Sequence, residues 1–270
     1  MKEISSLHPP SGEPSPDISS RSAAAALNEE VYDRLPRGYR DYWRFMAAPR
    51  FRMETILHLL GGSEPRCVVD LGCGTGLLLT KVAERLPHAL RVGIDIAPRQ
   101  LDIARAADPS ASWHVVDLDT DAPVIPSELE GAANAIIAAE LVEHLDHPKR
   151  LLTSARRLAS TGCRLILSTQ SGPVRHTELR VGHRRHFSTD EMSELLREAG
   201  WNPVRVWNAG WPFHDLSKWW ANRNPEGSMQ RFGEQGYGWS ERAVCWTLRQ
   251  LFRFNSNRRG AQLFAVAEAP

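Results

Sequence analysis

The sequence has 270 residues and contains no run of about 18 apolar residues, the length that a helix needs to cross a lipid bilayer. It also lacks an excess of charge of one sign. The formal net charge is only +1, which gives no general attraction to nucleic acid. Residues 1–22 lack the apolar stretch of a secretory signal. These absences exclude a transmembrane helix and lead us to expect a cytoplasmic protein with no membrane partner.

Cysteine is scarce, because the chain has only four, and their spacing is not that of a metal site. We expect them to be reduced, buried thiols. Residues 1–22 are rich in Ser, Pro and Gly and have little apolar surface to bury, so we expect a disordered tail. Residues 23–62 form a predicted N-terminal helical segment. Its aromatic side chains belong either to the core or to a lid over a ligand site.

After two consecutive glycines at positions 61 and 62, predicted strands and helices alternate, which is typical of a parallel sheet with helical crossovers. We therefore treat residues 63–270 as one α/β domain. Ser188 and Glu191 form a capping box at the start of its last predicted crossover helix. The expected strands are 67–71, 90–94, 112–116, 135–139, 164–168, 204–207 and 263–266. The expected helices are 77–86, 98–107, 148–158 and 189–199.

An insertion over residues 209–259 separates the last two predicted strands, and we expect it to form a helical cap. Of the nine tryptophans in the chain, five lie in this insertion. We expect these tryptophans to form the core of the cap, and contact with a substrate is the alternative. Ligands of open α/β sheets bind outside the carboxyl ends of the strands. A cap in this position would lie over such a site.

The most informative stretch of the chain runs from Val68 to Gly76. Two valines and Asp70 lead into three glycines at alternate positions, of which Gly72 and Gly74 are the first two. Such a run turns a buried strand sharply into a helix and leaves room for a ligand beside the backbone. The third glycine comes one residue too early for the dinucleotide fingerprint. A carboxylate at the end of the strand also suits a cationic ligand better than a pyrophosphate.

These nine residues resemble motif I of the class I S-adenosylmethionine-dependent methyltransferases. The resemblance implies an α/β fold with a Rossmann-like, seven-stranded, mostly parallel sheet and helices on both faces. The N-terminal helical segment and the cap between the last two strands add to that sheet. The resemblance also implies S-adenosylmethionine as the methyl donor, with S-adenosylhomocysteine as the product. The motif residues that it assigns to the donor are Asp70, Gly72, Cys73, Gly74 and Gly76.

Acidic residues at the ends of the next two predicted strands complete the expected donor site. Asp95 ends the second strand, where a carboxylate can accept hydrogen bonds from both ribose hydroxyls. The resemblance assigns it to the ribose and assigns Ile96 to the face of the adenine. After the third strand it assigns Asp117 to the adenine amine and Leu118 to the ring through its backbone N–H. Asp119 competes with Asp117 for that role.

The segment from Glu140 to His144 resembles that of the ubiquinone-biosynthesis O-methyltransferase branch and its small-molecule relatives. We assign Glu140 to the cofactor. His144 is the candidate general base, because an imidazole that titrates near neutral pH suits removal of a proton from a hydroxyl. Orientation of the substrate and a structural role are the alternatives for His144. The branch implies a small-molecule acceptor that is methylated at a hydroxyl oxygen.

A second resemblance is to the metal site of small-RNA 2′-O-methyltransferases. Its ligands would be Glu140, Glu143, His144 and either His183 or His186, with His186 preferred. Such mixed oxygen and nitrogen sites suit Mg²⁺ or Mn²⁺. The two arginines between His183 and His186 would repel a cation if they pointed inward. A metal and an RNA substrate are therefore not favoured, and a metal-dependent RNA 3′-terminal 2′-O-methyltransferase is the alternative function.

A third alternative is a protein that binds S-adenosylmethionine without transferring its methyl group, because motif I governs binding rather than transfer. For the RNA alternative, a basic track could come from Arg249, Arg253, Arg258 and Arg259, although a solvated helix face is the simpler interpretation. The sequence carries no signal for an oligomeric state.

Overall fold

The computed structural model describes residues 37–62, 64–120, 123 and 125–270. The expected disordered tail and the first part of the predicted helical segment lie outside these residues. Two helices, α2 (Arg37–Phe45) and α3 (Ala47–Leu60), occupy the rest of that segment. Pro49 lies in the first turn of α3, where its missing N–H removes no hydrogen bond from the helix.

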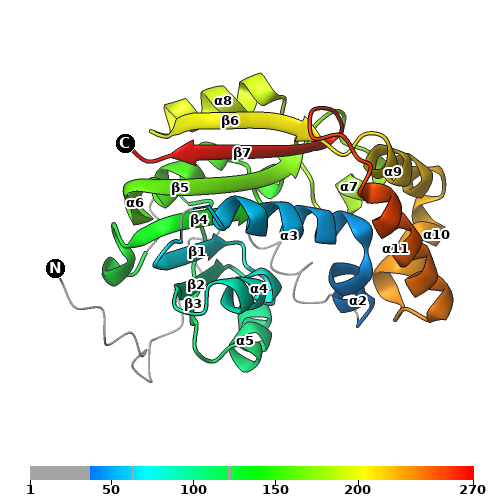
Figure 1. Cartoon of the computed structure of the whole chain (residues 1–270), viewed down its shortest axis with the longest axis horizontal. Coiled ribbons are helices and arrows are strands. Elements are labelled where there is room, and N and C mark those ends of the chain that lie inside the picture. Colours follow the sequence, from blue (N-terminus) through cyan, green and yellow to red (C-terminus); the bar gives the residue numbers. More distant parts are fainter. Residues whose placement is uncertain (1–36, 63, 121–122, 124) are drawn as a thin grey trace.

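A seven-stranded sheet forms the centre of the molecule, with the strand order β3-β2-β1-β4-β5-β7-β6 (Figure 1). Neighbouring strands are parallel except at β7, which runs antiparallel to both β5 and β6. This order confirms the Rossmann-like, mostly parallel sheet expected from the sequence. The strands are β1 (Cys67–Leu71), β2 (Leu90–Asp95), β3 (Ser112–Val115), β4 (Ala133–Ala139), β5 (Ala159–Gln170), β6 (Asn202–Ala209) and β7 (Gln262–Glu268).

Several strands are longer than the sequence predicts, and two of them extend past a residue that usually interrupts a strand. β5 begins at Ala159 rather than at residue 164, because a shift in its register with β4 lets the backbone pass Gly162 at a φ of 73°. β6 begins at Asn202 rather than at residue 204 and therefore includes Pro203, which lacks the N–H that a central strand would need. This proline is tolerated because β6 lies at the edge of the sheet.

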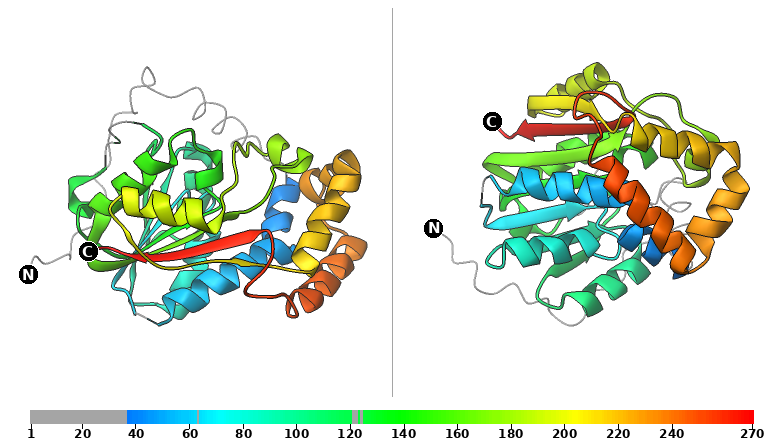
Figure 2. Two further views of the ribbon diagram at one scale, coloured as in Figure 1. Left: turned by 90° about the horizontal axis from the view of Figure 1, so that it is seen from above. Right: turned by 45° about the vertical axis from the view of Figure 1, so that its right-hand side comes forward.

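Helices cover both faces of the sheet (Figure 2). The buried apolar side chains form two clusters, one with α3, α4 and α5 and the other with α6 and α8. The predicted capping box of α8 is present, because Ser188 Oγ accepts from the Glu191 N–H and the Glu191 carboxylate accepts from the Ser188 N–H. These helices are α4 (Leu77–Arg85), α5 (Pro98–Ala107), α6 (Pro148–Leu158) and α8 (Thr189–Glu198), with the short helices η2 (Ser127–Leu129), η3 (Val142–His144) and α7 (His176–Arg180) between strands.

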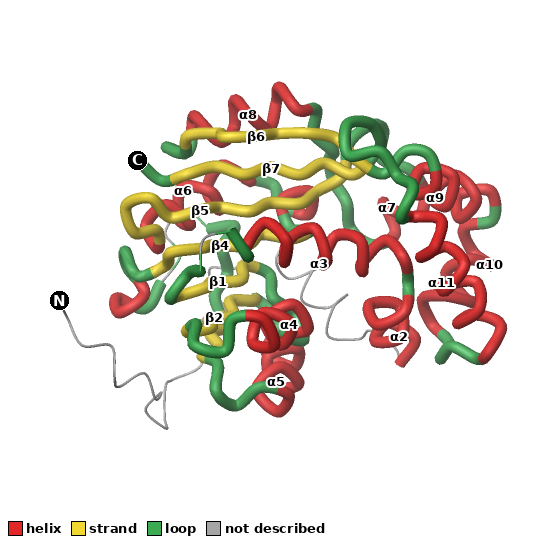
Figure 3. The backbone as a smooth tube through the Cα atoms, in the orientation of Figure 1, coloured by secondary structure: helices red, strands yellow, loops and turns green. Residues whose placement is uncertain are grey.

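Four helical elements form the expected cap between β6 and β7. They lie beyond the carboxyl ends of the parallel strands, beside α2 (Figures 1 and 3). The cap packs on the N-terminal helices, mainly through contacts of η4 with α2 and of α11 with α3. Its elements are α9 (Phe213–Arg223), α10 (Pro225–Met229), η4 (Gln230–Glu234) and α11 (Trp239–Phe252). No helix in the described part of the chain is long and apolar enough to cross a membrane.

The tryptophans of the cap do not form its core, so the interpretation favoured from the sequence is wrong. All five are exposed, and Trp239 reaches 86%. The buried side chains of the cap include those of His214, Cys245 and Phe252 instead. The cap needs few large residues inside because its inner surface packs against α2 and α3. The exposed tryptophans are Trp211, Trp219, Trp220, Trp239 and Trp246.

Gly93 on β2 is required by the packing of a large neighbour. A Cβ at this position would lie 2.4 Å from the ring of Trp113 and 2.8 Å from Cys73 Sγ. Trp113 is held in place because its indole N–H donates to the Asp108 carbonyl at 3.0 Å. We predict that Gly93→Ala lowers the free energy of unfolding by about 1–3 kcal/mol through overpacking. Urea unfolding followed by circular dichroism measures this change.

The matched control for that variant is Gly62→Ala. Gly62 is exposed, and a Cβ there would meet only the tip of the Arg164 side chain, at 3.9 Å. The control should unfold like the wild type. Equal stability of the two glycine variants would contradict the packing argument.

Candidate active site

The turn between β1 and α4 has the conformation that its glycines predict. Gly72 and Gly74 have φ angles of 70° and 52°, which other residues rarely adopt. The N–H groups of Gly72 and Cys73 donate to the Ile94 carbonyl at 2.8 and 3.2 Å. A Cβ on Gly72 would lie 2.9 Å from the Leu141 side chain. The turn is therefore fastened to the end of β2 and packed against the loop after β4.

The loops at the carboxyl ends of β1 to β4 converge on one pocket, whose further wall comes from α2 and α3. Of the residues predicted for the cofactor, only Gly76 does not line it. Gly76 precedes α4 at a φ of 73°, and a Cβ there would lie 2.4 Å from the Trp113 ring. A glycine is therefore needed at position 76 because the Trp113 ring packs against it. The predicted residues that line the pocket are Asp70, Gly72, Cys73, Gly74, Asp95, Ile96, Asp117, Leu118, Glu140 and His144.

Two carboxyl groups give this pocket an acidic end. Asp95 accepts hydrogen bonds from the Gly74 N–H at 2.8 Å and from the Ala97 N–H at 2.9 Å, so its orientation is fixed by backbone. Asp70 is buried, with 2% of its surface exposed. Burial, and then the charge of Asp95, raise the pKa of Asp70 well above its ordinary value. A bound cation would relieve both effects.

The loop after β3 distinguishes the two competing aspartates. Asp119 accepts from the backbone N–H groups of Asp146 and His147 at 3.1 and 3.0 Å, which places its carboxylate at the start of α6. Asp117 accepts from the N–H of Asp119 at 2.9 Å. Both line the pocket. Because Asp119 already orders the loop before α6, Asp117 is the better candidate for a ligand contact.

The Glu140 carboxylate accepts hydrogen bonds from three side chains. It accepts from Ser168 Oγ at 3.1 Å, from Gln170 Nε2 at 2.7 Å and from Gln262 Nε2 at 2.8 Å. Arg52 Nε lies 3.6 Å from it. Burial alone would raise the pKa of Glu140, but the Arg52 guanidinium and the two glutamine hydrogen bonds outweigh it and lower that pKa to about 2. Glu140 is therefore ionised at neutral pH.

Helices α2 and α3 supply a wall of the pocket, which matches the lid that the sequence left open as one alternative, although no single residue was assigned to it. Trp43, Arg52 and Met53 line the pocket, and the Arg52 guanidinium lies 5.6 Å from the Trp43 ring centroid. Ile56 lines the pocket too and is also part of the buried core. The N-terminal helices thus serve both as core and as a cover. Only the aromatic content of this segment hinted at such a role, and nothing near Arg52 in the sequence marks its pairing with Glu140.

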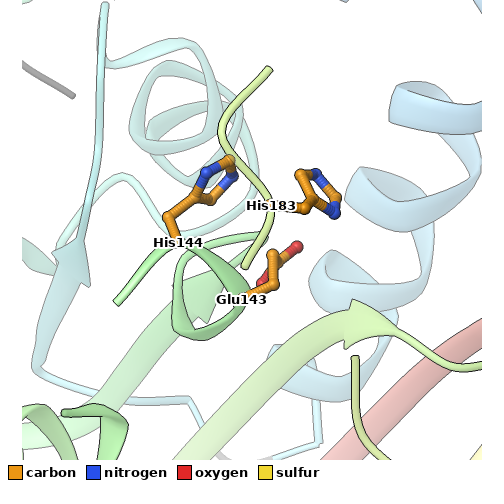
Figure 4. Close-up of side chains that lie close together, drawn as sticks. All are labelled: Glu143, His144 and His183. Carbon is orange, nitrogen blue, oxygen red and sulfur yellow. The ribbon is translucent and has the colours of Figure 1, made fainter. Parts of the chain in front are cut away.

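A cluster of imidazoles and one carboxyl group lies beside the pocket (Figure 4). The rings of His144 and His183 are 4.7 Å apart between centroids, and His183 Nδ1 lies 3.0 Å from His186 Nε2. Burial lowers the pKa of His144 to about 4 and that of His183 to about 3. Both rings are therefore neutral at physiological pH. An imidazole with a pKa near 4 is a weaker base than the sequence led us to expect.

The two arginines between the clustered histidines do not point into the cluster. Arg184 forms an ion pair with Asp146. The guanidinium of Arg185 lies over the Phe187 ring at 4.6 Å, and both arginines are exposed. Neither guanidinium therefore enters the cluster, although the charge of Arg184 still helps to lower the pKa of His144. The predicted basic track is weakened, because Arg249 pairs with Glu54 of α3 at 3.0 Å.

Comparison with solved structures supports the fold. The chain superposes on geranyl diphosphate C-methyltransferase from Streptomyces coelicolor A3(2) with a TM-score of 0.62 and 12% identity, covering 93% of this chain and 99% of the other. The N-methyltransferase NodS from Bradyrhizobium japonicum WM9 gives a TM-score of 0.57 at 17% identity, covering 92% and 99% of the two chains.

Comparison of sequences identifies the family to which the chain belongs. Residues 42–206 match the profile of a family described as a methyltransferase domain. The chain is 28% identical to the malonyl-[acyl-carrier protein] O-methyltransferase of Geobacter sulfurreducens, over 66% of this chain and 72% of that protein. It is 30% identical to the ubiquinone biosynthesis O-methyltransferase of Alkalilimnicola ehrlichii, over 44% of this chain and about half (47%) of that relative. The chain belongs to the methyltransferase domain family and is a class I S-adenosylmethionine-dependent methyltransferase of the small-molecule type.

The pairing of Arg52 with Glu140 leads to a prediction about stability. Removing one partner of a buried ion pair leaves the other charge uncompensated, so we expect Arg52→Met to cost about 3–5 kcal/mol. The same substitution should cost much less in a Glu140→Gln background, because no buried carboxylate then remains. Urea unfolding of the four proteins of this double-mutant cycle measures the coupling.

The pH dependence provides the check on that cycle. Glu140 has a lowered pKa, so the stability that its ionised form contributes is present above pH 4.5 and is lost as the pH falls towards 2. The coupling energy should shrink over the same range. A coupling near zero at neutral pH would contradict the assignment of the pair.

Proposed function

We propose that the pocket binds S-adenosylmethionine and that the enzyme transfers the methyl group to a hydroxyl oxygen of a small molecule. The observation that carries the first part is the convergence of Asp70, Asp95 and Asp117 on one pocket beside the glycine turn. S-adenosylmethionine carries a positive sulfonium and an ammonium group, which suit a pocket with acidic walls. Asp95 accepts hydrogen bonds from the ribose hydroxyls, and Asp117 accepts one from the adenine amine. Ile96 packs on the adenine ring.

The choice of oxygen is supported by the names of the relatives. Both sequence relatives described above are O-methyltransferases. A further relative, from Pseudomonas aeruginosa, is a trans-aconitate 2-methyltransferase that is 32% identical over 44% of this chain and 42% of that protein. A small acceptor also fits a pocket whose outer wall is made by Trp43, Arg52 and Met53.

The reaction is an in-line displacement at carbon. The acceptor oxygen forms a bond to the methyl carbon while the carbon–sulfur bond breaks, and its electron pair stays on sulfur to give neutral S-adenosylhomocysteine. Alignment of oxygen, carbon and sulfur can supply roughly 7–11 kcal/mol of the required lowering of the barrier. The hydroxyl proton is released to water. His144, which lines the pocket, is neutral and orients the acceptor.

Asp95 provides the test of the donor site. Asp95→Asn keeps the shape of the side chain but removes the negative charge that strengthens its hydrogen bonds from the ribose hydroxyls. Hydrogen bonds to charged groups contribute about 1.5–3 kcal/mol, so we expect the Kd for S-adenosylmethionine to rise roughly 10- to 150-fold. Isothermal titration calorimetry measures it.

Asp102→Asn is the matched control for this test. Asp102 lies on α5, its side chain is exposed, and it pairs with Arg105 at 2.8 Å. The control should bind the donor like the wild type. If both variants bind as tightly as the wild type, the pocket has been assigned wrongly.

Turnover separates transfer from binding alone. We expect the full chain to convert S-adenosylmethionine to S-adenosylhomocysteine when it is supplied with a panel of small phenols, diols and carboxylic acids, and mass spectrometry of the product locates the methyl group on oxygen. Donor binding without turnover on any acceptor would favour a protein that binds S-adenosylmethionine without transfer. Methylation at nitrogen or carbon would contradict the proposed acceptor atom.

A further inference from the structure

A second hollow of the molecule lies between the loop after β5 and the first part of α9. Its lining shares no residue with the lining of the donor pocket. The loop contributes Pro173 and Arg175, and the cap contributes Trp211, Leu216 and Trp219. We call this hollow the cap groove. Helix α7, which follows the loop, lies beside α9 (Figure 1).

The cap side of the groove presents apolar surface to solvent. Leu216, Trp219 and Trp220 are three and four residues apart, so they lie on one face of α9. Such a stripe normally packs against a neighbouring element. Here Trp219 is 45% exposed, and Trp211 at the start of the cap is 52% exposed. A gathered apolar surface of this kind marks an interaction site.

Polar contacts hold the two sides of the groove together. The Thr177 N–H donates to Asn222 Oδ1 at 3.2 Å, which joins α7 to α9. Lys218 Nζ of α9 lies 2.6 Å from the Glu178 carboxylate of α7 and also donates to Gln170 of β5 at 2.8 Å. The groove is therefore preformed, and a ligand can bind without the protein losing much conformational freedom.

The exposed charges around the groove are basic. In α7, α9 and the loop before α7, the charged side chains that are fully exposed are Arg175, Arg180 and Arg223. The acidic side chains of the same segments are engaged. Glu178 is buried, and Asp215 accepts from a backbone N–H at 2.8 Å. The groove thus suits an apolar ligand that carries negative charges.

One segment of this chain has that chemistry. Residues 9–17, which lie outside the described residues, have the sequence PPSGEPSPD, with four prolines, two acidic residues and no basic residue. Their composition gives them too little apolar surface to build a core of their own. Proline-rich segments bind in aromatic-lined grooves, because proline rings pack on aromatic faces and the restricted backbone loses little entropy.

The chain between this segment and the fold is long enough to reach the groove. Residues 18–36 separate it from Arg37, where α2 begins. An extended chain of this length spans up to about 65 Å. A domain of this size has a radius of gyration of about 18 Å, so that span exceeds its diameter. Helix α2 also contacts the cap, through η4.

We propose that residues 9–17 dock in the cap groove, with their prolines against the indole rings and with Glu13 and Asp17 towards the arginines. A linker of this kind gives an effective concentration of about 1 mM. A segment whose intrinsic Kd is only about 100 µM would therefore fill the groove about 90% of the time. The docked segment covers indole surface on which copies of the protein would otherwise associate.

A synthetic peptide of residues 8–18 tests this docking, with fluorescence anisotropy of a labelled peptide as the measurement. Its partners are the full wild-type chain and a full chain that carries Pro9→Ala, Pro10→Ala, Pro14→Ala and Pro16→Ala. We expect about 10-fold tighter binding to the alanine chain, because the tail of the wild type competes for the groove at an effective concentration of about 1 mM.

Tryptophan variants of the alanine chain locate the binding site. Trp219→Ala should weaken binding of the peptide about 10- to 30-fold, and Trp211→Ala is the second variant of this kind. The matched control is Trp239→Ala, which removes an 86% exposed indole of the cap that does not line the groove. It should bind like its parent. Arg175→Gln should bind more weakly and with less dependence on salt.

Circular dichroism establishes that each variant is folded before its binding is compared. If the peptide does not bind the alanine chain, the groove has been assigned wrongly. If it binds the wild type and the alanine chain equally, the tail is not the occupant, and a proline-rich partner would be favoured instead. Equal binding by the folded Trp211, Trp219 and Trp239 variants would also refute the proposal.

Discussion

The buried carboxylate of Glu140 is the interaction on which the geometry of the pocket depends. It lies where β4 ends, at the point where the strand order reverses, and it is ionised although only 11% of its side chain is exposed. A buried charge persists only when donors surround it. The donors come from α3, β5 and β7, and Gln170 extends the network to Lys218 of α9. One charge thus fastens the N-terminal helices, the sheet and the cap around a single site.

Two regions of opposite electrostatic character meet along this carboxylate. On one side Asp70 and Asp95 crowd together beside the glycine turn, where burial and mutual repulsion favour a cationic ligand. On the other side His144 and His183 are kept neutral by burial. We infer that the first region receives the sulfonium of the donor. Arg52 balances the charge of Glu140 between the two regions.

The donor half of the site could be predicted because its signals are local. The glycine turn depends on φ angles that only glycine adopts readily, and Asp95 and Asp117 each follow a strand that the pattern of apolar residues marks out. The acceptor half could not be predicted in the same way. Arg52 meets Glu140 across 88 positions of sequence, and nothing in either local segment records the pairing. The prediction that the cap tryptophans form its core was wrong for a related reason. The apolar character of a residue does not determine whether its face of a helix packs against another element.

By itself, the sequence determined the order of strands and helices, the sharp turn at Gly72 and Gly74 and the class of the donor, because each depends on the conformational limits and chemistry of neighbouring residues. Only the tertiary structure decided which polar groups are already satisfied. It showed that Glu140 is occupied, that Glu143 has an oxygen to spare, and that the Arg184 and Arg185 side chains turn away from the histidines. Hydrogen bonds between distant segments control those outcomes. They exist only once the chain has brought η3, β5, β7 and α3 together.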